Sequence, residues 1–194
     1  MKKVLIPSLV LLGIIILIFI DTGFSVLTPL VGPYGPDPLE PSIKHAEFPF
    51  ELVYKINGKR KTIKDILICE YDGIGGEVDT YKCREWESSF ASGNERIVLW
   101  KDSDVKSLNE LTAEMIVPYQ EIYYDIGTAW YYMGDLEEGE EKQLQSGLAY
   151  FQHALELGDI VEDIGYLEDK MVFEKFGIKI ISWKCAPPIK NTFK

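Results

Sequence analysis

Three cysteines are the most reactive side chains in this sequence, and their spacing favours a structural role over a catalytic one. Cys69 and Cys83 would close a loop of about 15 residues, and a disulfide there would stabilise the fold by roughly 3 kcal/mol. Cys185 would then remain as the unpaired thiol. No C-x-x-C occurs, so the spacing does not support a zinc site or a thioredoxin-like redox motif. Two alternatives stay open: a Cys69–Cys83 disulfide, or three thiols.

Histidines and carboxylates do not form a recognisable catalytic or metal-binding motif. His45 and His153 are isolated, and neither H-E-x-x-H nor G-x-S-x-G occurs. The segment DGIGGEVD starts at Asp72, but Ile74 and Gly76 stand where an EF-hand calcium loop needs oxygen ligands. We therefore expect no metal and no cofactor. A hydrolase with paired carboxylates is the alternative function, because 31 acidic residues offer many candidate pairs.

Aromatic residues between positions 119 and 132 provide the best candidate binding surface. Trp130, Tyr131 and Tyr132 are consecutive, and neighbouring side chains on a β-strand point to opposite faces of the sheet. At least one ring would then point away from the core, where it can contact a peptide or a sugar. Packing of these rings under a loop is the alternative. The candidate partners are an envelope protein or a glycan.

The first 25 residues predict where these groups would act. Residues 4–20 contain no charged side chain, and 17 residues of helix span about 25 Å, close to the thickness of a bilayer core. Lysines at positions 2 and 3 favour a cytoplasmic location for residues 1–3, so the rest of the chain would lie outside the cytoplasm. We predict a signal anchor over residues 4–25. Secretion after cleavage near Ser25 and a helix buried in the core are the alternatives.

Beyond the anchor, the sequence predicts a spacer and one acidic domain. Six of the ten prolines fall within residues 26–49, and such a composition favours an extended linker. Residues 50–194 are numerous enough for a single globular domain with its own core. All 31 acids but only 18 of the 20 basic residues lie after residue 20, giving that part a net charge of −13. This charge excludes nucleic acid as a partner, because its phosphates require a basic surface.

A period of two at the start of the domain predicts a β-hairpin. Apolar side chains alternate over residues 50–56, and Asn57 and Gly58 follow. Both of these residues accept the positive φ angles of a type I′ turn. The resulting register places Glu51 opposite Lys64, a favourable pair of opposite charges.

Capping residues, periodicity and aromatic content predict the other elements. Ser107 and Glu110 have the spacing of a capping box, and Gly177 suits the end of a helix. We expect strands over 96–100, 122–133 and 178–183, helices over 107–115 and 167–176, and either a helix or a strand over 144–157. The predicted fold class is α+β, with a β-dominated, mainly antiparallel extracytoplasmic domain preceded by a single N-terminal transmembrane helix.

Four stretches carry a resemblance to known proteins: FPFELVYKINGK, ICEYDGIGGE, SGNERIVL and FGIKIISWKCAPPIKN. They resemble small exported proteins of Gram-positive bacteria that have no assigned activity. The resemblance implies a location in the cell envelope and assigns no role to any residue. From the sequence we therefore expect a membrane-tethered, non-enzymatic binding or structural domain.

Overall fold

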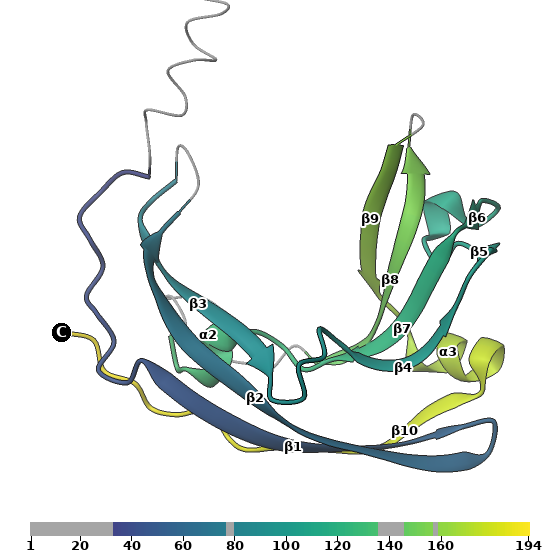
Figure 1. Ribbon diagram of the computed structural model, residues 1–194, viewed down its shortest axis with the longest axis horizontal. Coiled ribbons are helices and arrows are strands. Elements are labelled where there is room, and N and C mark those ends of the chain that lie inside the picture. The colour runs from purple at the N-terminus through teal and green to yellow at the C-terminus, as the bar shows by residue number, and fades with distance from the viewer. Residues whose placement is uncertain (1–32, 77–79, 136–145, 157–158) are drawn as a thin grey trace, which may run out of the picture. The chain divides into compact units, whose positions relative to one another are not determined.

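The computed structural model of the chain describes residues 33–76, 80–135, 146–156 and 159–194 (Figure 1). The predicted anchor over residues 4–25 lies outside the described residues. Within the described part, no helix combines the length and the apolar character needed to cross a membrane. The described residues divide into two compact units. The smaller unit comprises 33–40, 71–76, 80–85 and Lys194, and the larger comprises 41–70, 86–135, 146–156 and 159–193.

Antiparallel β-strands form most of the structure, in agreement with the predicted β-dominated, mainly antiparallel fold. Two four-stranded sheets have the orders β10-β1-β2-β3 and β4-β7-β8-β9, and β5 pairs with β6. The strands are β1 (His45–Ile56), β2 (Lys59–Gly75), β3 (Cys83–Phe90), β4 (Ile97–Asp102), β5 (Val105–Lys106), β6 (Ile116–Val117), β7 (Tyr119–Asp125), β8 (Gly147–Glu156), β9 (Asp159–Tyr166) and β10 (Ile178–Cys185). The helices are a 3-10 turn, η2 (Glu110–Thr112), and two α-helices, α2 (Ala129–Tyr132) and α3 (Asp169–Phe176).

The hairpin between β1 and β2 has the predicted turn and register. Asn57 and Gly58 have φ angles of 49° and 77°, as a type I′ turn requires. Glu51 lies opposite Lys64, and the ammonium group of Lys64 is 2.6 Å from the carboxylate of Glu51. The hydrogen bond from Lys64 lowers the pKa of the Glu51 carboxyl group.

Strand β1 begins at His45, inside the segment that the sequence assigned to the linker. The reason is that the apolar alternation starts earlier than residue 50. Phe48 is 2% exposed and lies on the same face of β1 as Phe50. Pro49 between them fits in the strand, and its carbonyl oxygen accepts a hydrogen bond from the Ala186 amide at 3.0 Å.

The remainder of the predicted linker is partly held against the chain, within the smaller unit. The backbone amide of Tyr34 donates to the Thr80 carbonyl, and the Lys82 amide donates to the Tyr34 carbonyl, both at 3.0 Å. The rings of Tyr34 and Tyr81 pack with centroids 4.5 Å apart, and Lys82 forms a 2.7 Å ion pair with Asp37. These contacts hold Tyr34 and Asp37 against residues 80–82, and residues 26–32 of the predicted linker lie outside the described residues.

The predicted helix over 107–115 is wrong, because only the single turn η2 forms there. Asn109, not Ser107, caps this turn and accepts a hydrogen bond from the Leu111 amide at 2.9 Å. Ser107 is buried, and its hydroxyl oxygen accepts a hydrogen bond from the Gln152 side chain at 2.7 Å. The Ser107 hydroxyl oxygen also accepts a hydrogen bond from the Asn109 amide at 3.1 Å, so Ser107 joins this turn to β8 and does not begin a longer helix.

The predicted strand over 122–133 is also wrong in its second half. β7 ends at Asp125, whose carboxylate accepts a hydrogen bond from the Gly127 amide at 2.9 Å. Gly127 has a φ of 89°, which turns the chain out of the strand. The helix α2 follows at Ala129–Tyr132.

The C-terminal elements match the sequence more closely. Residues 144–157, left open between helix and strand, contain the strand β8. The helix α3 ends at Gly177, which has a φ of 65° and donates its amide to the Phe173 carbonyl, as the sequence predicted. Strand β10 begins at Ile178, also as predicted. Strand β9 was not anticipated.

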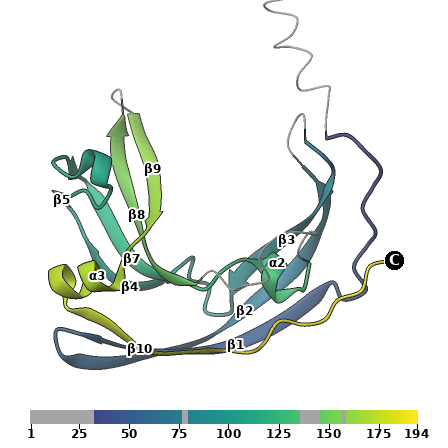
Figure 2. The same ribbon diagram turned by 180° about the vertical axis from the view of Figure 1, so that it is seen from behind.

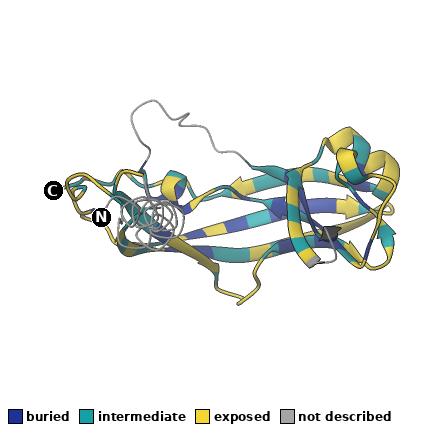
Figure 3. Cartoon of the chain, turned by 90° about the horizontal axis from the view of Figure 1, so that it is seen from above, coloured by how far each residue is buried: buried dark blue, intermediate teal, exposed yellow. Residues whose placement is uncertain are grey.

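Within the larger unit, aromatic side chains fill the core between the strands. Trp183 of β10 packs against Phe50 and Tyr124, with ring centroids 5.3 Å and 5.1 Å apart, respectively. Leu52 and Ile122 are fully buried. Figure 3 shows the buried residues as bands along the strands. Such apolar burial is the dominant stabilising contribution to a fold of this kind.

Replacement of Gly58 by valine tests the turn. A Cβ atom at this position meets no atom within 4 Å, so we attribute the cost to the positive φ angle. We expect Gly58→Val to lower the free energy of unfolding by about 1 kcal/mol or more, because a β-branched residue resists positive φ. Urea denaturation measures this change. The matched control is Gly58→Asn, which tolerates positive φ and should cost clearly less; an equal cost would contradict the type I′ turn.

Candidate functional site

The aromatic triplet Trp130, Tyr131 and Tyr132 lies in the helix α2 and not on a strand. Tyr132 is 1% exposed, and its hydroxyl group donates to the Ile126 carbonyl at 2.9 Å. Its ring packs against Phe48 with centroids 5.0 Å apart, and burial raises its pKa. Trp130 is 36% exposed. The strand geometry on which the predicted binding surface depended is therefore absent here, and Tyr132 belongs to the core.

All three cysteines are present as thiols, so the structure contains no Cys69–Cys83 disulfide. Cys69 is completely buried, and this burial raises the pKa of its thiol to about 12. Burial also raises the pKa of Cys185. Nucleophilic chemistry requires the thiolate, so Cys69 and Cys185 are suited to packing.

A buried network of amide side chains organises one face of the sheet β4-β7-β8-β9. Gln152 of β8 is fully buried, and its amide nitrogen donates to Ser107 and to Asp163, at 2.7 Å in each case. Its amide oxygen accepts hydrogen bonds from the Gln120 side chain at 2.8 Å and the Leu108 backbone at 3.0 Å. Buried polar groups that are satisfied in this way hold neighbouring elements in one arrangement. We therefore assign this network a structural role.

The opposite face of the same sheet contains the candidate functional site. Strand register puts alternate residues of β7, β8 and β9 on this face. We call it the Arg96 face, because the guanidinium group of Arg96 lies across it. It comprises Arg96 together with Tyr119, Glu121, Tyr123, Asp125, Phe151, His153, Ile160, Glu162, Ile164 and Tyr166.

Arg96 is held on this face by a ring and a carboxylate. Its guanidinium carbon is 3.8 Å from the centroid of the Phe151 ring and 6.0 Å from that of Tyr123. One guanidinium nitrogen is 3.7 Å from the carboxylate of Glu121, whose side chain is only 9% exposed. A buried carboxylate requires such partners, and a cation over an aromatic face is attracted by the ring quadrupole. Arg96 is therefore positioned by its surroundings while its side chain remains 25% exposed.

Two tyrosine–carboxylate pairs extend the face. The Tyr119 hydroxyl group donates to Glu121, and this hydrogen bond raises the pKa of Tyr119 to about 12. The Tyr166 hydroxyl group donates to Asp125 at 2.5 Å, and this bond raises the pKa of Tyr166 to about 12. His153 packs beside Tyr119, with ring centroids 5.5 Å apart. Both carboxylates are thus oriented by donors from the protein itself.

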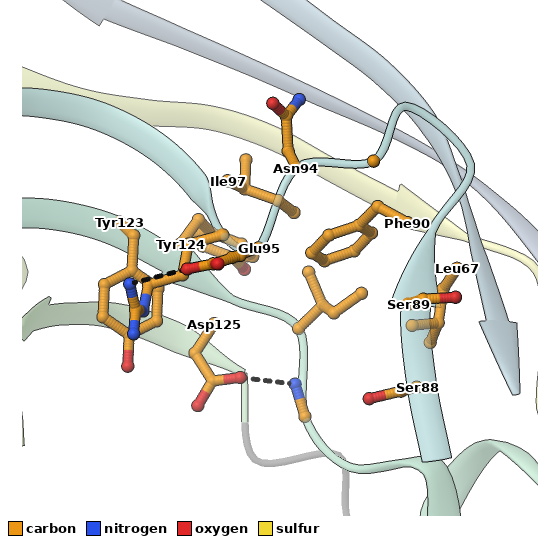
Figure 4. A pocket seen from close by; sticks show the side chains of 14 residues that line it. Leu67, Ser88, Ser89, Phe90, Asn94, Glu95, Ile97, Tyr123, Tyr124 and Asp125 are labelled. Carbon is orange, nitrogen blue, oxygen red and sulfur yellow. Dashed lines mark hydrogen bonds and ion pairs between the residues drawn. The ribbon is translucent and has the colours of Figure 1, made fainter.

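A cavity of about 370 Å³ opens at one end of the Arg96 face. Figure 4 shows Leu67 and Phe90 on one side of it, and Tyr123 and Asp125 on the other. Arg96 also lines this cavity. The volume lies in the range of small-ligand sites, so the cavity can accept one or a few side chains of a partner.

The acids of the cavity do not form a buried catalytic pair. The Glu95 side chain is 88% exposed and lies 3.8 Å from Arg96. Asp125 accepts hydrogen bonds from the Gly127 amide and the Tyr166 hydroxyl group. Among the described residues, no group of three histidines, cysteines or acids is placed to hold a metal ion. Glu77 and Asp79 of the glycine-rich segment are outside the described residues.

Comparison with known proteins gives no match for this chain, whether with protein-family models, with curated proteins or with solved structures. The Arg96 face was not found from the sequence, because its members come from segments separated by up to 70 positions. The alternation of Tyr119, Glu121 and Tyr123 along one strand was the available signal.

Alkaline titration tests the Tyr119–Glu121 pair. The pKa of Tyr119 is raised in the folded chain from 10 to about 12. The unfolded chain therefore loses this proton first, and the stabilisation that is complete below pH 10 declines as the pH rises towards 12. We expect Tyr119→Phe to remove one tyrosinate absorbance step near pH 12.

Tyr81→Phe is the matched control, because Tyr81 is 70% exposed. It should leave the late step intact. If Tyr119→Phe instead removed a step near pH 10, the hydrogen bond to Glu121 would be disproved.

Proposed function

We propose that this protein is a membrane-tethered, non-enzymatic binding domain outside the cytoplasm, and that it holds a segment of an envelope protein on the Arg96 face. The predicted anchor over residues 4–25 and the resemblance to exported proteins support the location. The net charge of −13 beyond residue 20 supports a protein partner over nucleic acid.

The observation that carries the proposal is the position of Arg96. A guanidinium group fixed between Phe151 and Glu121 loses little conformational entropy when a ligand binds. Arginine and tyrosine are also the residues most often found at the energetic centre of interfaces. The cavity beside Arg96 provides a concave site for a partner side chain.

The exposed side chains of the face favour a peptide over a glycan. Sugars stack on open aromatic rings, but Phe151 is only 4% exposed and lies under Arg96, which leaves Tyr166, at 59%, as the one largely exposed ring of the face. Ile160 and Ile164 are instead 64% and 57% exposed. Exposed aliphatic side chains next to polar groups are typical of protein interfaces.

Site-specific photo-crosslinking in cells that naturally produce the protein tests this proposal. A photoreactive phenylalanine analogue replaces Tyr123, which lines the cavity. We expect a protease-sensitive adduct with the full-length protein, and we expect Arg96→Met to reduce its yield about tenfold, as for a residue at the centre of an interface.

Leu111 provides the control position, because it is 94% exposed and lies outside the Arg96 face. The same analogue there should give no adduct. Equal yields at both positions would contradict the proposal. An adduct that glycosidases but not proteases remove would identify a glycan instead.

A further inference from the structure

We infer that β9 is an open sheet edge that accepts a basic, apolar segment of the partner as an additional antiparallel strand. This inference rests on the proposed binding function and specifies the chemistry of the partner. Strand addition to an exposed edge is a common mode of peptide recognition, in which backbone hydrogen bonds supply affinity and alternate side chains supply specificity.

Among the described residues, β9 is the last strand of the sheet β4-β7-β8-β9, and Figures 1 and 2 show it beside β8. The amide of Leu167 donates to the carbonyl of Leu148 at 2.8 Å. Hydrogen-bonded and non-hydrogen-bonded pairs alternate along an antiparallel ladder, so the backbone groups of every second residue before Leu167 point away from β8. These residues are Ile160, Glu162, Ile164 and Tyr166.

The same four residues place their side chains on the Arg96 face. Ile160, Ile164 and Tyr166 are 57% to 64% exposed, and Glu162 is also exposed. Opposite them on β8 lie Phe151 and His153. Alternate side chains of a strand added at this edge would therefore lie beside Ile160, Ile164 and Tyr166, which are apolar, and beside the acid Glu162.

Natural edges are protected from pairing by charged side chains, especially lysine, by proline or by a β-bulge. β9 has no lysine, no proline and no bulge, and its charged residues are three acids, which repel an acidic strand but attract a basic one. β10 contains Lys179 and Lys184, and β4 contains Lys101 and an irregular register with β7. β9 has the sequence DIVEDIGY, with neither lysine nor proline, and pairs with β8 in an uninterrupted register.

Charge identifies the chemistry of the added strand. β9 contains three acids and no basic residue, in a chain with a net charge of −11. An opposite charge across from Glu162 stabilises strand pairing, whereas a like charge destabilises it. A second copy paired around Glu162 would bring that acid opposite itself. The geometry therefore favours a different protein, with a segment that alternates lysine or arginine with aliphatic residues.

A defined peptide tests this inference with the full-length protein in detergent micelles. The probe is a fluorescent peptide of eight residues, the length of β9, that alternates lysine and valine. The control peptide replaces each lysine by glutamate. In fluorescence anisotropy we expect the lysine peptide to bind at least about tenfold more tightly than the glutamate peptide. Equal binding would overturn the inference.

Two variants separate backbone pairing from charge. Ile164→Pro removes one outward amide, and proline is tolerated at such an edge position; we expect it to weaken binding of the lysine peptide at least about fivefold. Ile164→Val keeps the amide and should bind as the original protein does. Glu162→Lys should reverse the preference between the two peptides, and it provides a test even if Ile164→Pro does not fold.

Other outcomes are equally informative. If Ile164→Pro and Ile164→Val bind alike, strand addition is wrong. If crosslinking at Tyr123 then survives in Ile164→Pro, the proposed binding function still holds, but strand addition at β9 is not how the partner binds. Concentration-dependent dimers in sedimentation, abolished by Ile164→Pro, would identify a second copy as the occupant and overturn the basic partner.

Discussion

The burial of one carboxylate constrains the whole candidate site. Glu121 is 7% exposed, and an ionised carboxylate removed from water to this extent is costly unless donors surround it. Tyr119 supplies a hydrogen bond from the same strand, and Arg96 supplies a positive charge from the residue before β4. Because Arg96 must reach Glu121, its guanidinium group is held over Phe151. The most exposed strand of the sheet, β9, borders this arrangement.

The two faces of the sheet β4-β7-β8-β9 thus have different roles. On one face, Gln120 and Gln152 satisfy each other and bind the segment that contains Ser107. That face keeps β7, β8 and β9 in register. On the other face, arginine, tyrosine and aliphatic side chains remain partly accessible. A rigid support with an accessible face is what a binding site needs, because little order has to be created when a ligand arrives.

The parts of the fold that depend on local physics could be predicted from the sequence. The Asn57-Gly58 turn and the end of α3 at Gly177 require positive φ angles, and few residues supply them. The turn at Gly127 also requires a positive φ angle. The aromatic and β-branched residues on either side of Gly127 nevertheless predicted a continuous strand over 122–133. The strand expected through Trp130–Tyr132 is wrong for that reason, because these residues lie in the helix α2. The contact between Arg96 and Glu121 could not be predicted, because only the pairing of β4 with β7 brings these residues together.

Residue-resolved amide hydrogen exchange of the free, full-length protein tests the central claim most directly, since an edge can bind a strand only if it is open beforehand. Exchange rates report whether each backbone amide is already hydrogen-bonded. We expect the amides of Ile160, Glu162, Ile164 and Tyr166 to exchange at least about tenfold faster than those of Val161, Asp163 and Gly165, which face β8. Equally slow exchange of both sets would mean that another part of the molecule already covers β9, and it would contradict the account of the Arg96 face as an open binding surface.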